Sequence, residues 1–191
     1  LREKVDTNYM LQVGQSTIIE SESINLLGVT ITRNLSWDTH VRNVVSSLRS
    51  NNGLISRITT YVPNKMVTPL VHGLIMSKIR YCLPLFCDVR QSPSDPISSS
   101  MHDLQVQLNN AMQTVSGVKL EDRVEVSDLL LQVGIPSVNQ LAAETTLLET
   151  WRQINLGSSL WNMAPAAFRH ETDLNKAKQI AKTFCSSLPS F

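Results

Sequence analysis

Residues 24–48 read INLLGVTITRNLSWDTHVRNVVSSL, and the spacing of their apolar residues changes half-way along the stretch. Every second residue from Leu27 to Ile31 is apolar, which is the period of a half-buried strand. From Trp37 to Leu48 the apolar residues recur mostly three or four positions apart, which is the period of a helix with one buried face. The stretch therefore predicts a strand that is followed directly by a helix.

The first predicted helix begins after Ser36, because serine side chains cap helix N-termini, and it ends at Gly53, because glycine commonly follows the last turn. Arg42 and Arg49 are seven residues apart, so they share a side of this helix away from its apolar face. That face consists of Trp37, Val41, Val44, Val45 and Leu48.

A second helix is predicted to reach about Cys82, and Pro69 leaves two starts open. In the preferred interpretation the helix begins at Pro69 with Thr68 as its N-cap, because proline is tolerated in the first turn. In the alternative the helix begins near Asn64 and is kinked at the proline. Its apolar residues are Met66, Leu70, Leu74 and Ile75.

The chain ahead of the first helix has the composition of β structure. An apolar run at residues 9–13 is followed by a turn signal at residues 14–16 and by β-branched residues at 17–19. This pattern predicts a hairpin, with one more strand over residues 27–31.

The remainder of the chain is predicted to be helical after a loop. Residues 88–100 contain two prolines and five serines, so little in them can pack. The residues after the loop predict a helix from Met101 to Val115 stopped by Gly117, a short helix over Ser127–Val133, a helix that follows the capping-box spacing of Ser137 and Gln140 and ends at Gly157, and a last helix over Leu174–Phe184.

The expected fold class is α+β, mainly α, with a short N-terminal antiparallel hairpin or sheet. Its expected parts are a β-rich segment at residues 1–35, a helical segment at 36–90, a linker at 91–100 and a helical C-terminal region at 101–191.

Composition excludes some classes of protein. Hydrophobic residues make up 42% and charged residues 17%, which allows a buried core and argues against disorder. The longest apolar stretch is interrupted by His72, Lys78 and Arg80, so no membrane span is expected, and no signal-peptide pattern is present. We expect an intracellular protein, cytoplasmic or nuclear. Because Leu1 is not a start methionine, we also expect the chain to begin inside a longer reading frame.

The three cysteines, Cys82, Cys87 and Cys185, are too few for a disulfide framework, and we expect reduced, mostly buried thiols. A zinc site built from Cys82 and Cys87 with His72 or His102 is an alternative. Its Cys-x4-Cys spacing is tolerable, but no second paired half-site follows it.

Positive charge is concentrated in one part of the chain. Residues 33–90 hold eight basic and two acidic residues, a net charge of +6, whereas the whole chain carries only +1. A basic surface without base-reading groups suits contacts with the phosphates of any nucleic-acid sequence. The candidates are Arg42, Arg49, Arg57, Lys65, Lys78 and Arg80, and the alternative is a solvated charged face without a ligand.

Four stretches resemble, in the same order, sequence blocks of the reverse transcriptases of non-LTR (LINE-type) retrotransposons. Residues 24–41 are similar to the block that follows the catalytic palm, and residues 75–84, 104–117 and 160–165 are similar to three later blocks. The chain departs from the family's pattern at Leu108, Gln113 and Ala164, of which Gln113 stands where the family usually has arginine. The matching residues of the first block are Leu27, Gly28, Val29, Ile31, Leu35, Trp37 and His40.

The resemblance implies the end of the palm, the thumb and the helical C-terminal region of an RNA-directed DNA polymerase. Such enzymes hold two metal ions between paired aspartates, and the parent enzyme would use Mg²⁺. This chain has no Asp-Asp pair, so we expect no catalytic or metal-binding residue and no cofactor in it. The expected partners are an RNA or DNA template–primer duplex and the upstream palm and fingers.

Three residues of the first block, Leu27, Gly28 and Val29, resemble the strand that touches the primer end in that family. A glycine in an edge strand or bulge is an equal alternative. Trp37 is expected in the core rather than as a base-stacking platform, and His40 is expected to be structural rather than catalytic. Two other functions stay open: a non-catalytic nucleic-acid-binding remnant and a helical protein–protein scaffold built on residues 101–186.

Overall fold

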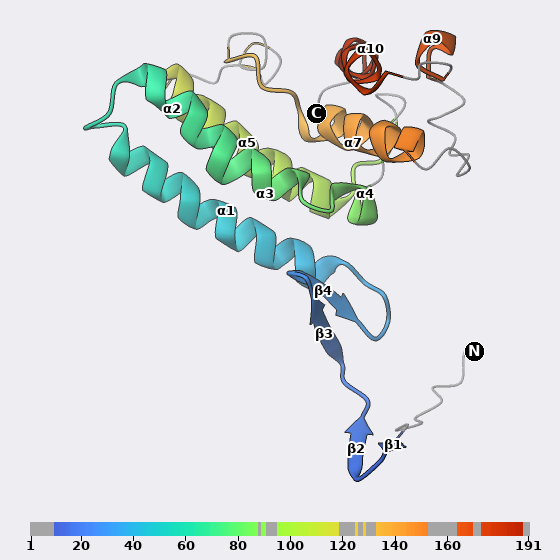
Figure 1. Ribbon diagram of the computed structural model, residues 1–191. Coiled ribbons are helices and arrows are strands. Elements are labelled where there is room, and N and C mark those ends of the chain that lie inside the picture. Colours follow the sequence, from blue (N-terminus) through green and yellow to red (C-terminus); the bar gives the residue numbers. More distant parts are fainter. Residues whose placement is uncertain are drawn as a thin grey trace. The chain divides into compact units, whose positions relative to one another are not determined.

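The computed structural model describes residues 10–87, 89–90, 95–118, 125, 128, 133–152, 164–169 and 173–188 (Figure 1). The chain forms two compact units, residues 1–40 and 41–191. Two short antiparallel strand pairs precede a mostly helical remainder, so the expected α+β, mainly α class is confirmed.

Residues 10–40 of the first unit form two separate two-stranded hairpins rather than a hairpin and one more strand. Leu27 and Gly28 form the turn of the second hairpin, so the prediction of a continuous strand over residues 27–31 is wrong at its start. Both have positive φ, 50° and 85°, as a two-residue turn between twisted strands requires. The Gly28 N–H donates to Asn25 Oδ1 at 2.9 Å and closes this turn. The pairs are β1 (Met10–Val13) with β2 (Ser16–Ile19), and β3 (Ser23–Leu26) with β4 (Val29–Thr32).

The second unit is helical, and it contains all of α1 except the first three residues of that helix, Asp38 to His40. One apolar core is built from helices on both sides of the predicted linker, because Leu48 and Leu104 are fully buried in the same cluster. A second cluster joins α7, α9 and α10. The helices are α1 (Asp38–Ile58), α2 (Asn64–Val71), the π-helical η1 (His72–Met76), α3 (Ser77–Arg80), α4 (Leu83–Phe86), α5 (Ser99–Ser116), α7 (Val138–Arg152), α9 (Ala166–Arg169) and α10 (Leu174–Ser186).

The predicted stop of the first helix at Gly53 is wrong, because α1 continues to Ile58. A glycine inside a helix costs about 0.5–1 kcal/mol relative to alanine. Burying an isoleucine side chain contributes about 1.5–3 kcal/mol, and Ile55 is fully buried just beyond the glycine. Packing therefore carries the helix through the residue that locally favours an end.

The preferred start of the second helix at Pro69 is also wrong, because α2 begins at Asn64 and the proline lies inside it. Proline has no N–H to donate to the preceding turn, and its ring crowds the carbonyl four residues earlier. The hydrogen-bond pattern then widens into η1, where the Ser77 N–H bonds to the carbonyl of His72, five residues back. Val71 and Ile75 are fully buried, so the core holds the interrupted helix together.

Three signals at other helix ends are local and are confirmed, whereas Ser36 is not the N-cap of the first helix, because α1 begins two residues later at Asp38. Gly117 ends α5 in the left-handed conformation with φ 71°. Ser137 and Gln140 form the predicted capping box at α7: Ser137 N donates to Gln140 Oε1 at 2.9 Å and Gln140 N donates to Ser137 Oγ at 3.2 Å. The last helix is present as α10. Most of the predicted helix at residues 127–133, and the predicted end at Gly157, lie outside the described residues.

Candidate nucleic-acid interface

Three of the six candidate residues lie along one exposed side of α1. At about 100° per residue, Arg42 and Arg49 are roughly 20° apart around the helix axis, and Arg57 is within roughly 80° of both. All three side chains are exposed, whereas Leu48 and Ile55 are buried on a different side of the helix. We call Arg42, Arg49 and Arg57 the arginine stripe.

One acidic residue, Asp38, lies one turn before Arg42 on α1, and the sequence around Arg49 and Arg57 carries no negative charge. No Asp or Glu occurs between Thr39 and Cys87 in the sequence. Ser46, which lies between Arg42 and Arg49 on the same side of the helix, is exposed and neutral. At about 1.5 Å of rise per residue, the three arginines are spaced about 10 and 12 Å apart along α1.

Lys78 lies on the opposite flank of α1 from Arg42 and Arg49. Its ammonium donates to Ser47 Oγ. Asn51, one turn after Ser47, donates to the carbonyl of Leu74 at 2.7 Å, so this flank of α1 packs against η1 and α3. Ser47 and Asn51 are roughly 140–180° around the axis from the two arginines. The six candidates therefore do not form one surface.

The two remaining candidates lie on other helices than the stripe. Lys65 is exposed in the first turn of α2. Arg80, at the end of α3, forms an ion pair with Glu144 of α7, with 3.4 Å between Nη2 and Oε2. The guanidinium of Arg80 is thereby directed to α7, so Arg80 belongs to a different site.

The predicted primer-contacting residues belong to the first unit. Leu27 is 84% exposed at the tip of the β3–β4 hairpin, and Val29 is buried. His40 is buried and accepts a hydrogen bond at Nδ1 from the Thr30 N–H, at 3.4 Å. Burial lowers the pKa of His40, which keeps the imidazole neutral and able to accept. Trp37 is half-buried. A role of the hairpin turn in primer contact stays a prediction.

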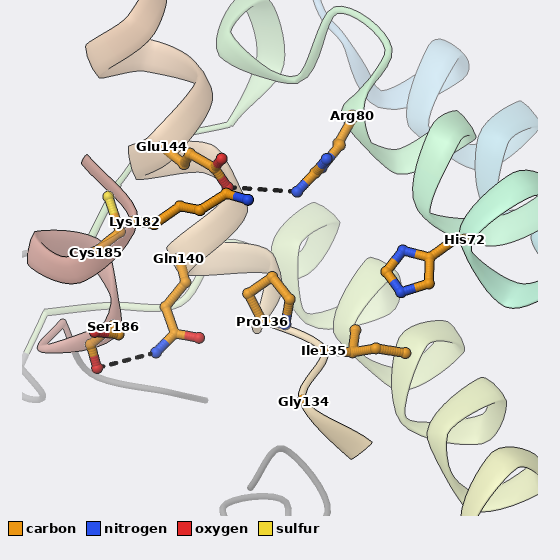
Figure 2. A pocket seen from close by; sticks show the side chains of 10 residues that line it. All are labelled: His72, Arg80, Gly134, Ile135, Pro136, Gln140, Glu144, Lys182, Cys185 and Ser186. Atoms are coloured by element: carbon orange, nitrogen blue, oxygen red, sulfur yellow. Dashed lines mark hydrogen bonds and ion pairs between the residues drawn. The ribbon is translucent and has the colours of Figure 1, made fainter. Parts of the chain in front are cut away.

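A cavity that the sequence did not predict lies between η1, α3, α7 and α10, and Figure 2 shows the side chains around it. Its volume is about 410 Å³. The cavity joins residues far apart in the chain, so no local spacing in the sequence could have indicated it. It is lined by His72, Arg80, Gly134, Ile135, Pro136, Gln140, Glu144, Lys182, Cys185 and Ser186.

Cys185 is the thiol at this cavity, and it is a poor nucleophile. Burial, together with the negative charge of Glu144, raises the pKa of Cys185 to about 12. The three cysteines are free thiols, of which Cys87 and Cys185 are buried and Cys82 is half-buried. Within the described residues, no group of three His, Cys, Asp or Glu side chains is placed to hold a metal ion, so the alternative zinc site gains no support.

Comparisons with protein-family models, with curated protein sequences and with solved structures gave no match. The family resemblance therefore rests on the four sequence stretches alone. In the part of the chain that the structure describes, no helix has both the length and the apolar character needed to cross a membrane.

Proposed function

We infer that this chain is the post-palm part of a non-LTR retrotransposon reverse transcriptase, and that it holds the template–primer duplex through the arginine stripe. The observation that supports this function best is the alignment of Arg42, Arg49 and Arg57 on one exposed side of a 21-residue helix. Guanidinium groups bind phosphate oxygens with two parallel hydrogen bonds, and such contacts are independent of base sequence. A duplex grip of this kind suits a polymerase that copies any sequence.

The proposal depends on the arginine stripe and not on all the basic residues between positions 33 and 90. Lys78 lies on the other flank of α1, and Arg80 is paired with Glu144. We therefore assign the phosphate contacts to the stripe, with Lys65 as a peripheral contributor. The acidic residues needed for polymerisation are assigned to the upstream palm of the parent enzyme.

The test compares the full chain with the triple variant Arg42→Gln, Arg49→Gln, Arg57→Gln. Fluorescence anisotropy measures binding of two duplexes of unrelated sequence across a range of salt concentrations. Each phosphate contact contributes about −0.9 to the slope of log Kobs against log salt, so the variant should lose about 2.7 of slope and bind both duplexes more weakly. Equal slopes for the variant and the unmodified chain would overturn the assignment.

A matched control removes the same amount of charge elsewhere. Arg169 and Lys176 are exposed and Lys178 is half-buried, and all three lie in α9 and α10. The variant Arg169→Gln, Lys176→Gln, Lys178→Gln also lowers the net charge by three, and it should keep most of the salt slope. A loss equal to that of the stripe variant would mean that net charge alone drives binding.

A non-catalytic remnant would use the same stripe, so binding alone does not separate it from a polymerase. The coding sequence upstream of Leu1 distinguishes the two functions. A palm block with paired aspartates in frame supports the polymerase, and its absence leaves only the binding function.

A further inference from the structure

The cavity between α3, α7 and α10 is lined by two cationic side chains, Arg80 and Lys182, and by the imidazole of His72. His72 belongs to η1, Arg80 to α3 and Lys182 to α10. In Figure 2, Arg80 reaches toward Glu144 on α7, and Lys182 extends toward the same pair. With one carboxylate, Glu144, against the two cations Arg80 and Lys182, the lining carries a net positive charge.

Within the described residues, most hydrogen-bond donors of Arg80, Lys182 and His72 have no partner. Arg80 uses one nitrogen for Glu144, at 3.4 Å, and makes no other polar contact within the described residues. The side chains of Lys182 and His72 have no polar partner in that same part of the chain. Charge-assisted bonds from Arg or Lys to phosphate are typically near 2.7–2.9 Å. The Arg80–Glu144 contact is longer than this, so the guanidinium can form a shorter hydrogen bond to a bound phosphate.

The uncharged polar groups of the cavity are already engaged. The amide of Gln140 accepts from Ser137 N and donates to the carbonyl of Ser186 at 3.4 Å. The hydroxyl of Ser186 donates to the carbonyl of Thr183 at 2.7 Å. These side chains are poorly placed to read the edge of a base, so recognition depends on Arg80 and Lys182 and on the apolar wall formed by the half-buried Pro136.

We propose that this cavity binds a nucleoside phosphate monoester, with the phosphate near Arg80 and Lys182 and the flat base against Pro136. The volume of about 410 Å³ is within the range of small-molecule sites, roughly 300–1,000 Å³. The apolar wall favours a nucleotide over inorganic phosphate or a sugar phosphate. The monoester can come from a free nucleotide or from the 5′-phosphorylated end of a strand.

The site goes beyond the duplex grip and does not depend on it, because none of its lining residues belongs to the arginine stripe. Isothermal titration calorimetry on the full chain uses AMP, inorganic phosphate, and a short oligonucleotide with and without a 5′-phosphate. We expect saturable AMP binding that is tighter than inorganic phosphate binding. Preference for the 5′-phosphorylated oligonucleotide over AMP identifies a strand end as the source, and the reverse identifies a free nucleotide.

Lys182→Gln is the decisive variant, because this exposed side chain has no polar partner within the described residues and its loss leaves the fold intact. AMP affinity should fall roughly tenfold or more, since a hydrogen bond to a charged group is lost. Arg80→Lys keeps a charge opposite Glu144 and should bind more weakly than the unmodified chain. Arg169→Gln is the control and should bind AMP normally. Undetectable AMP binding, or equal binding by Lys182→Gln, overturns the proposal.

The stripe variant separates the two proposals. Arg42→Gln, Arg49→Gln, Arg57→Gln should bind AMP with unchanged affinity, because its substitutions lie on α1, which contributes no residue to the cavity lining. Loss of AMP binding in this variant would overturn the assignment to the cavity.

Discussion

Gln105 of α5 accepts the backbone N–H of Val138, the first residue of α7, through Oε1 at 2.8 Å. Gln105 is 3% exposed, and its amide nitrogen donates to Asn109 on its own helix at 2.7 Å. The first amides of a helix have no partner within the helix. A side chain from another helix therefore supplements the capping box of Ser137 and Gln140.

Replacing Gln105 by leucine should lower the free energy of unfolding by about 1–3 kcal/mol, because the buried Val138 N–H loses its acceptor. Urea denaturation followed by circular dichroism measures the change. Asn109→Ala removes only the other hydrogen bond of Gln105, leaves the bond to Val138 in place and should cost less than the leucine variant. Equal losses in the two variants would show that the hydrogen bond to Val138 is unimportant.

Gly53→Ala should stabilise the chain by about 0.5–1 kcal/mol, because the glycine lies inside α1 and alanine restricts the unfolded chain more. An added Cβ would meet only the Arg57 guanidinium at 4.0 Å, which is ordinary contact. The control is Gly134→Ala, at φ +69°, where an L side chain is strained, and it should destabilise. Thermal unfolding of both variants gives the measurement, and a lower midpoint for Gly53→Ala would contradict the prediction.

Acidification below about pH 6.5 should destabilise the first unit through His40. Burial lowers the pKa of His40 in the folded chain from its usual value of 6.5, so the unfolded chain binds the proton more readily. The stabilising contribution is complete above the unfolded pKa and is lost as the pH falls below it. Protonation of Nδ1 would also remove the lone pair that accepts the hydrogen bond from the Thr30 N–H.

His40→Asn tests this dependence, because its side-chain oxygen can accept the same hydrogen bond without titrating. Urea midpoints between pH 8 and pH 5 should fall for the unmodified chain and change less for the variant. Parallel curves for the two proteins would exclude His40 as the titrating group.

Lys78→Gln should change duplex affinity by less than about twofold, because a charge away from the binding surface contributes only a screened interaction. Arg49→Gln should weaken binding more, although both substitutions remove one positive charge. Fluorescence anisotropy at one low salt concentration compares the two variants directly. If Lys78→Gln were the more damaging change, the duplex would have to lie on the flank of Ser47 rather than on the arginine stripe.

The sequence by itself determined the features that depend on near neighbours along the chain. The period of the apolar residues indicated the helices, and Gly117 and Ser137 marked helix ends, because caps involve atoms only a few residues apart. Arg42 and Arg49 were placed on one side of a helix by their spacing alone.

Only the tertiary structure decided which distant residues meet. Burial of Ile55 carried α1 past Gly53, and burial of Val71 held α2 across Pro69 against the local signals. Packing also turned Lys78 toward Ser47 and brought Arg80 to Glu144. The spacing of residues along the chain describes one helix at a time. The contacts between helices depend on how their apolar faces pack together. That packing placed the arginine stripe and the cavity at different sites.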